Sequence, residues 1–255
     1  MQPFWTILIT GLLGCSASPL NKLSRKYAPP SPYADWPTYD ELPLDSSSPT
    51  KAAWGVWGAD DSLGALNHIT AATILSAAQS EIRTGLAINL NLELDIPDPP
   101  VNPTRTSLSH LFQPEDGYTD DVLIMNTQIS TQYDGLRHFV YSEEGATSIY
   151  RYYNDLIPSY EDVIGPNPTT ILGIQEAAQK GIAGRGILLD YARWMDSQGA
   201  TIDVFSSQTI TAAELDAVAD FQGLSGKWAQ PGDILLIRTG WVRQYNTLSK
   251  ADQQA

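Results

Sequence analysis

The sequence predicts one domain of the α/β class, and two observations support this prediction. In the second half of the chain, segments with apolar residues at helical spacing alternate with short apolar runs typical of strands. In the first half, period-two alternation of apolar residues indicates further strands. The 255 residues contain no internal repeat and no obvious linker, so a single domain is the simplest interpretation.

The first half contains one predicted helix and one predicted strand. Residues 70–83 ("TAATILSAAQSEIR") carry alanines and aliphatic residues at helical spacing, and Gly85 follows as a stop signal. Residues 86–95 ("LAINLNLELD") alternate strictly and therefore predict a strand, with one face formed by Ile88, Leu90, Leu92 and Leu94. The prolines of residues 95–104 predict a loop.

Five further segments complete the predicted order of elements. In chain order the segments are a strand or strand pair at 122–134, a helix at 168–181, a buried strand at 184–190, a helix at 211–223 and a strand at 232–241. The start of the helix at 211–223 is marked by Thr211, because Glu214 is placed to complete a capping box with it.

The charge balance limits the class of partner. The formal net charge is −14, from 29 acidic and 15 basic residues. Binding to nucleic acid or to an anionic membrane surface requires clustered Lys and Arg, so both partners are disfavoured. The single cysteine, Cys15, excludes intrachain disulfides, CxxC redox chemistry and zinc fingers. A small-molecule substrate or ligand is therefore the partner that we expect.

The N-terminus resembles a secretory signal peptide. The apolar run from Phe4 to Leu13 is too short to cross a bilayer, and small residues precede a cleavage site after Ala17. Residues 1–17 are therefore predicted to be a signal peptide, which makes the mature protein secreted and leaves it without a membrane anchor. A lipoprotein box at "LLGC" and a buried N-terminal segment are the alternatives. Residues 18–50, rich in Pro, Ser and Asp, predict an irregular arm before a domain at 51–255.

The stretch "NTQISTQYDGLRHF" (126–139) carries the candidate site. If it is extended, one face presents Gln128, Ser130, Gln132 and Asp134, and His138 follows a bend at Gly135. Amides where a solvent-facing strand would carry charges indicate the wall of a polar pocket. His138 is a candidate general base, and Asp134 is placed to orient it or to bind a metal. The alternative is a hydrogen-bonded polar core in which the glutamines bond backbone groups.

Several common sites are absent from the sequence. It contains no GxSxG, GxxxxGK[ST] or HExxH motif, and "GRG" at 184–186 precedes its strand, so it is no dinucleotide fingerprint. His68 and His110 stand away from other candidate ligands and are more typical of packed or surface residues.

Four motifs in order resemble the cyclase / kynurenine formamidase-like family, in particular its fungal branch. They are "WGVWGADDSLGALNHIT", "NTQISTQYDGLRHF", "GRGILLDYARW" and "GDILLIRTGW", and they span residues 54–241. The resemblance implies a mixed-sheet α/β domain of the swivelling β/β/α type, and oligomers, a homodimer among them. It also implies a metal-dependent hydrolase, typified by arylformamidases that cleave N-formylkynurenine in tryptophan breakdown.

The family's metal motif, HxGTHxDxPxH, maps onto this chain with two replacements among its histidines. Asp134 matches the bridging aspartate and His138 the last histidine, whereas Gln128 and Gln132 stand at the other two histidine positions. Zn²⁺ prefers imidazole, thiolate and carboxylate, and the amide oxygens suit Mn²⁺ or Mg²⁺ better. The resemblance thus implies a divalent metal, Mn or Zn, with Asp134, Gln128, Gln132 and His138 as candidate ligands.

The resemblance also assigns roles to the remaining candidates. His138 takes a proton from the attacking water, with Asp134 as its acidic partner and His110 as a reserve ligand or acid. The aromatic surface for an aryl substrate, together with Gln128, is assigned to Trp54, Trp57 and Tyr133. Family members usually continue beyond "GDILLIRTGW" with a later histidine and glutamate, so we expect this domain to be incomplete at its C-terminus. A non-catalytic small-molecule-binding protein and a cyclase of secondary metabolism are the alternative functions.

Overall fold

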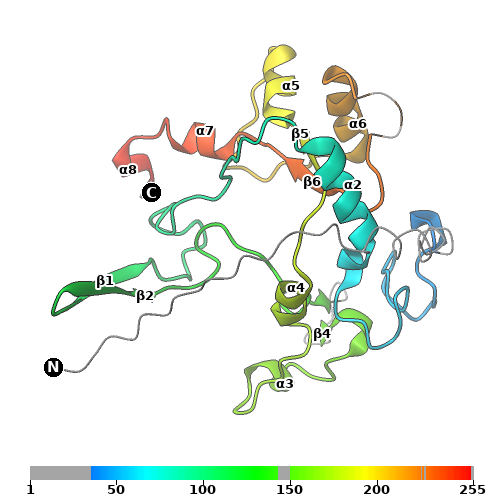
Figure 1. Cartoon of the computed structure of the whole chain (residues 1–255), viewed down its shortest axis with the longest axis horizontal. Helices are drawn as coiled ribbons and strands as arrows, with labels where there is room; N and C mark the ends of the chain where they lie inside the picture. Colours follow the sequence, from blue (N-terminus) through cyan, green and yellow to red (C-terminus); the bar gives the residue numbers. More distant parts are fainter. Residues whose placement is uncertain (1–35, 143–149, 225, 227, 254–255) are drawn as a thin grey trace, which may run out of the picture. The chain divides into compact units, whose positions relative to one another are not determined.

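The computed structural model describes residues 36–142, 150–224, 226 and 228–253 (Figure 1). Pro37–Ala255 forms one unit, and the description below concerns it. The expected signal peptide and residues 18–35 of the expected arm lie outside the described residues. The rest of the arm is irregular apart from the short 3-10 helix η1 (Tyr39–Glu41).

A parallel strand pair organises the second half of the chain. Strand β5 (Gly186–Leu189) pairs with β6 (Ile234–Ile237), as the sequence predicts, in a register that joins Gly186 to Ile234. Helix α6 (Ala212–Phe221) contacts both β5 and helix α5 (Tyr191–Ser197) (Figure 1). Its N-terminus carries the predicted capping box.

Only one face of this strand pair is covered. Side chains alternate across a strand, and Ile187 and Leu189 enter a core of apolar residues. The opposite face leaves Leu188 and Leu235 about half exposed. The buried strand expected at 184–190 is therefore buried on one side only. The core beneath β5 also contains Tyr191, Ile202, Val218 and Ala219.

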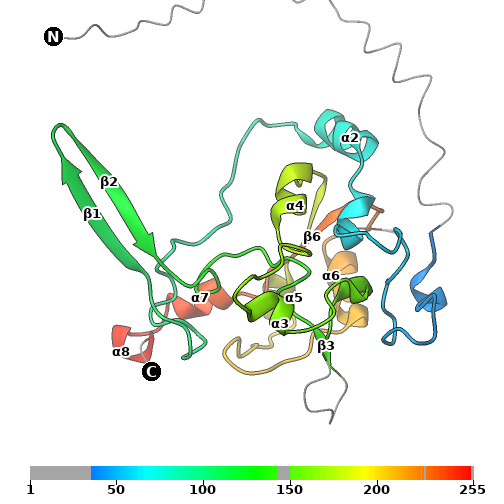
Figure 2. The ribbon, with the colours of Figure 1, turned by 90° about the horizontal axis from the view of Figure 1, so that it is seen from below.

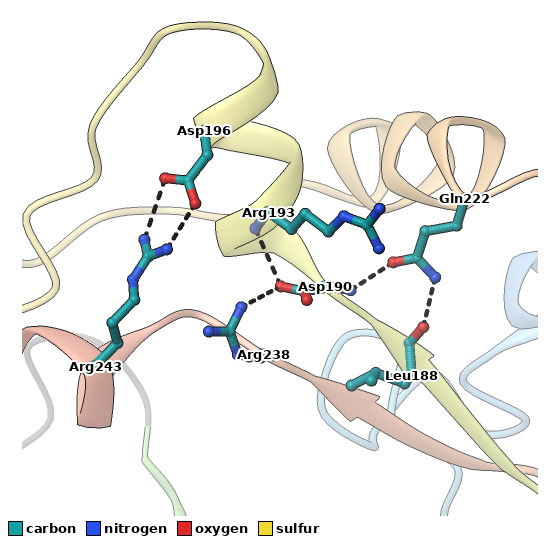
Figure 3. Close-up of polar contacts among 7 residues, drawn as sticks. All are labelled: Leu188, Asp190, Arg193, Asp196, Gln222, Arg238 and Arg243. Carbon is teal, nitrogen blue, oxygen red and sulfur yellow. Dashed lines mark hydrogen bonds and ion pairs between the residues drawn. The ribbon is translucent and has the colours of Figure 1, made fainter.

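Asp190 and Gln222 tie the ends of these elements together (Figure 3). The Asp190 carboxylate caps α5 by accepting from the Arg193 backbone N–H at 3.0 Å, and it accepts from Arg238 Nη1 at 2.6 Å. The Gln222 amide accepts from the Asp190 N–H and donates to the Leu188 carbonyl. The end of β5, the start of α5, the residue after β6 and the end of α6 are thus held by one polar network.

The first half contains a helix and a hairpin. Helix α2 (Ala71–Glu81) confirms the helix predicted at 70–83, and the Thr70 side chain caps it. Strands β1 (Ser109–Glu115) and β2 (Tyr118–Ile124) form an antiparallel hairpin around Asp116 and Gly117 (Figure 2). All its residues are exposed.

The strand predicted at 86–95 is wrong. This segment has no regular structure, and Leu86, Ile88 and Leu90 are each more than 70% exposed. A strand needs a partner for its backbone N–H and C=O groups, and no described segment pairs with this one. It is tethered instead by side chains, since Thr131 Oγ1 accepts from the Leu92 N–H at 2.8 Å and Ser130 donates to the Glu93 carbonyl at 2.6 Å.

The remaining elements are short. The helix predicted at 168–181 starts late, at Gln175, because the chain first turns through Thr170–Gly173 with Leu172 at φ 59°. It ends before Gly181, as predicted. The elements are β3 (Tyr141–Ser142), β4 (Tyr150–Arg151), α3 (Glu161–Ile164), α4 (Gln175–Lys180), α7 (Trp241–Tyr245), α8 (Lys250–Gln253), and the 3-10 helices η2 (Gly64–His68) and η3 (Tyr153–Asp155).

The structure confirms the α/β class and refines the expected sheet. Over the described ranges, the strands form three separate two-stranded sheets, β1–β2, β3–β4 and β5–β6, rather than one mixed sheet. None of the helices in this part of the chain has the length and apolar character needed to cross a bilayer.

Candidate functional site

A cavity of about 740 Å³ lies over a second apolar core. That core buries Tyr152, Ile157 and Leu172, and the first and last of these also form the cavity wall. The volume is in the range typical of small-molecule sites. The lining comes from three segments: Thr127, Gln128, Tyr133, Asp134, Gly135, Arg137, His138, Phe139, Val140 and Ser142; Tyr150, Tyr152, Tyr160, Val163 and Ile164; and Leu172, Gly173 and Ile174.

The stretch 126–139 reaches the cavity as a series of turns and not as a strand. The Asn126 side chain accepts from the Gln128 N–H at 2.9 Å, and the Ile129 N–H bonds to the Asn126 carbonyl. Such an Asx turn offers the backbone an alternative to a sheet ladder. The strand predicted at 122–134 therefore ends at Ile124.

Three predicted site residues converge at the polar end of the cavity. Gln128 Nε2 donates to Asp134 Oδ1 at 2.6 Å, and His138 Nε2 lies 3.9 Å from the same oxygen. The latter distance is too long for a hydrogen bond but short enough for an ion pair. The His138 and Asp134 side chains are 38% and 43% exposed, so solvent and ligands reach them. This arrangement can exchange protons with a bound molecule.

Two arginines that the sequence analysis did not select support this polar end. Arg105 Nη1 donates to the Gln128 carbonyl at 2.7 Å, which fixes the backbone that carries the amide. Arg137 lines the cavity, with its N–H bonded to the Leu172 carbonyl at 2.9 Å and its Nη1 bonded to the Thr169 carbonyl. Arg137 stands within the quoted motif, beside His138, so its position was a usable signal. The contact made by Arg105 spans the β1–β2 hairpin and had no local signal.

Tyrosines form the aromatic part of the wall. Tyr133, one of the candidate substrate-binding residues, lines the cavity, and the Tyr150 and Tyr160 rings lie 5.6 Å apart at 55°. Burial raises the pKa of Tyr152, the Tyr160 charge adds to the rise, and the Arg137 charge opposes it. The cavity thus joins a polar end to an aromatic wall.

Several other candidates lie outside the cavity lining. The Arg151 guanidinium covers the Trp54 ring at 4.8 Å, and the Trp57 ring meets His68 edge-on at 5.5 Å. These contacts place both tryptophans in packing, the alternative role for such residues. Burial lowers the pKa of His68, which favours its neutral form. Gln132 is exposed and is not part of the lining.

His110 lies on the β1–β2 hairpin. Its Nε2 is 3.0 Å from Asp121 Oδ1, and its ring lies 4.5 Å from the Phe112 ring. It therefore forms a second histidine–aspartate pair, outside the cavity lining. This pair is a useful internal control for the first.

The side chains at the polar end of the cavity suit Mn²⁺ better than Zn²⁺. Within the described residues, no three His, Cys, Asp or Glu side chains gather into a cluster that could hold a metal ion. Catalytic Zn²⁺ takes three protein ligands of these types, so these donors do not fit zinc. A carboxylate, an imidazole and an amide that can present its oxygen after rotation suit Mn²⁺ with water in the remaining positions.

The comparisons with known proteins agree on one family. Residues 48–255 match the family model described as "Putative cyclase". The solved structure of a protein described as a novel cyclase is similar to this chain, with a TM-score of 0.65 and 32% sequence identity. The match covers 79% of this chain and 66% of that one, so this chain spans slightly less than two thirds of that relative's length. No curated protein matches the sequence. Because the family model matches most of the sequence, the chain belongs to the cyclase family.

Proposed function

We propose that this protein is a hydrolase of aryl amides, similar to an arylformamidase, that acts on N-formylkynurenine or a related molecule. The observation that supports this proposal is the cavity itself. It places the Asp134–His138 pair and the Gln128 amide beside tyrosine side chains that suit an aryl group. Family membership agrees with an enzymatic role and leaves the reaction open.

In the proposed reaction, His138 acts first as a base and then as an acid. It removes a proton from a water molecule while the water oxygen adds to the amide carbonyl carbon. The carbon–nitrogen bond then breaks, and His138 returns the proton to the leaving nitrogen. The products are an amine and a carboxylic acid. Asp134 stabilises the imidazolium form of His138 between the two steps.

Gln128 and Arg105 hold the acidic partner in place. Gln128 donates to Asp134 Oδ1, and Arg105 in turn fixes the Gln128 backbone. Oδ1 is also the oxygen nearest the His138 imidazole, so the other carboxylate oxygen, Oδ2, is left for a cation or the substrate. Mn²⁺ held by Asp134 and Gln128 would polarise the substrate carbonyl as a Lewis acid. His138 then keeps the role of the base.

A matched pair of variants tests this function. His138→Ala is expected to reduce hydrolysis of a formanilide substrate about 10²- to 10⁴-fold, the range usual for loss of a general acid–base. His110→Ala removes the other histidine–aspartate pair and is expected to leave the rate unchanged. Rates would be measured with and without added Mn²⁺, beside the metal content of each purified protein. Equal rates in His138→Ala and wild type would remove His138 from the mechanism.

A non-catalytic binding protein is the second candidate, and one observation favours it. Two of the four positions expected to bind metal are glutamines, and Gln132 does not reach the cavity lining. This candidate predicts that an aryl amide binds in the cavity, that no turnover occurs and that chelators have no effect. The rate measurements above separate the two functions directly.

A further inference from the structure

One permanently cationic side chain lines the cavity. Among the described residues of the lining, Asp134, Arg137 and His138 are the only Asp, Glu, Lys, Arg or His side chains. A guanidinium stays charged at any ordinary pH. Arg137 therefore supplies a permanent positive charge in a described lining that, apart from Asp134 and His138, is aromatic, aliphatic and weakly polar.

Arg137 is anchored but not neutralised. Its backbone N–H and its Nη1 both bond carbonyls, those of Leu172 and Thr169, so its position is fixed from two sides. Nε and Nη2 have no hydrogen bond or ion pair within the described residues, and no ion pair joins Arg137 to Asp134. Four other arginines in this part of the chain pair with carboxylates: Arg151 with Asp155, Arg185 with Asp233, Arg238 with Asp190, and Arg243 with Asp196. Arg83, Arg105 and Arg193 also have no ion pair among the described residues, but none of these three lines the cavity.

Among the described residues, Arg137 has no carboxylate partner, although the chain is rich in acidic residues. The chain carries 29 acidic residues against 15 basic ones. A half-buried guanidinium gains more from a carboxylate than an exposed one does, because solvent screens the pair less. The planar fork of the guanidinium also matches the two oxygens of a carboxylate. A ligand carboxylate would satisfy the donors that the protein leaves open.

We propose that Arg137 binds a carboxylate of the ligand, so that the cavity selects aromatic molecules that carry a negative charge. The identification of that ligand with the substrate rests on the proposed function. In this arrangement the carboxylate of the ligand lies at Arg137 and its aromatic ring lies against the tyrosines of the cavity wall. The acyl group of the ligand then lies near His138, the residue that follows Arg137 in the sequence. Arg137 is then the residue that separates anionic from neutral aryl amides.

Binding of a matched pair of probes tests this proposal without any need for turnover. Benzoate and benzamide have nearly the same shape and differ in charge. Calorimetric titration of wild type is expected to show benzoate binding about ten- to a hundred-fold more tightly, as for a hydrogen-bonded charge pair. Arg137→Gln is expected to remove that preference, and Arg137→Lys, which keeps the charge but not the fork, to retain part of it.

Arg83 provides the control. Its Nε also donates to a backbone carbonyl, that of Ser80, and it does not line the cavity. Arg83→Gln is expected to keep the full preference for benzoate, and thermal unfolding of each variant shows whether it is folded. A wild type that binds benzoate no better than benzamide, or binds neither, overturns the proposal, as does a folded Arg137→Gln variant that keeps the preference.

The His138→Ala and Arg137→Gln variants, assayed for both hydrolysis and benzoate binding, distinguish failure of this proposal from failure of the proposed function. His138→Ala is expected to lose hydrolysis and keep the benzoate preference. If wild type hydrolyses no aryl amide but Arg137→Gln loses benzoate binding, the hydrolase function fails and the carboxylate site stands. If hydrolysis depends on His138 but the benzoate preference is absent, the hydrolase function stands and the role of Arg137 fails.

Discussion

Strand β5 and residues 86–95 are both rich in aliphatic residues, but the first is buried on one face and the second is largely exposed. In β5, Ile187 and Leu189 are buried, and Leu189 is 0% exposed beneath α6. In residues 86–95, Leu86, Ile88, Leu90 and Leu94 are exposed, and Leu90 is 72% exposed, whereas Leu92 is partly buried. Both stretches carry Leu and Ile, but residues 86–95 alternate them with polar residues. They differ in that β5 has a partner strand and a covering helix, whereas residues 86–95 have neither within the described part of the chain.

The difference shows what turns an apolar stretch into a strand. Side-chain alternation allows a segment to present one apolar face, but the backbone must also find partners for its N–H and C=O groups. β5 finds them in β6, and its apolar face finds the side chains of α5 and α6. Among the described residues, the backbone of 86–95 makes only two hydrogen bonds with a distant segment, to the side chains of Ser130 and Thr131, and its other bonds are local. In these two stretches, burial and strand pairing thus occur together.

Truncating one leucine in each stretch gives the largest expected contrast. Leu189→Ala removes a fully buried side chain and is expected to lower the free energy of unfolding by about 2–5 kcal/mol. Leu90→Ala removes an exposed side chain, and we expect a change within about 0.5 kcal/mol. Urea denaturation of both variants measures the two values. A loss of similar size in both would mean that residues 86–95 are also covered in solution.

Loss of a partly buried polar contact beside β5 should also cost more stability than loss of an exposed one on the β1–β2 hairpin. Asp190 caps α5 and binds Arg238, and its side chain is 21% exposed. Asp190→Ala is expected to cost about 2 kcal/mol, since it removes a helix cap and leaves an arginine unpaired. Asp121 pairs with His110, and its side chain is 60% exposed. Asp121→Ala is therefore expected to lower the free energy of unfolding by less than about 1 kcal/mol.

Asp190→Asn refines this test. Asparagine caps a helix as well as aspartate does, so this variant keeps the cap and removes only the charge that faces Arg238. Its loss of stability is expected to fall between those of Asp190→Ala and Asp121→Ala. If Asp190→Asn is as unstable as Asp190→Ala, the ion pair and not the cap carries the effect.

The sequence predicted the elements whose signals are local. The side chains of Thr70 and Thr211 cap the N-termini of α2 and α6, and these caps need no other segment of the chain. Gly181 likewise marks the end of α4. The β1–β2 hairpin also had a local signal, the Asp116–Gly117 turn with Gly117 at φ 88°, which went unused. The absence of a strand at 86–95 had no local signal, because it depends on which other segments are available to pair.

In the candidate site, too, the residues with a local sequence signal were predicted better than those that depend on contacts between distant segments. Gln128, Asp134 and His138 were selected from one stretch of sequence, and the structure brings them together at one end of the cavity. The reason given for their convergence was a strand, whereas turns produce it. The Trp54 and Trp57 assignments depended on packing between distant segments, and the cavity wall uses tyrosines instead.

Acid should weaken the well-packed region through the cap of α6. The Thr211 N–H and hydroxyl, and then the Tyr191 hydroxyl, donate to the Glu214 carboxylate and lower its pKa in the folded protein. A carboxyl group with a lowered folded pKa contributes stability that is present above its unfolded pKa. That contribution is lost as the pH falls through the folded pKa, so the expected window lies at and below the ordinary glutamate range.

Glu214→Gln isolates this contribution, because glutamine can complete the same capping box without a titrating group. The variant is expected to lose less stability than wild type when the pH is lowered from neutral into the acid range, although the other carboxylates still titrate in both. Thermal melts of the two proteins at matched pH values measure the difference. Parallel pH profiles would mean that the hydrogen bonds to Glu214 do not persist in solution, and that α6 is held by its apolar contacts with β5 rather than by its cap.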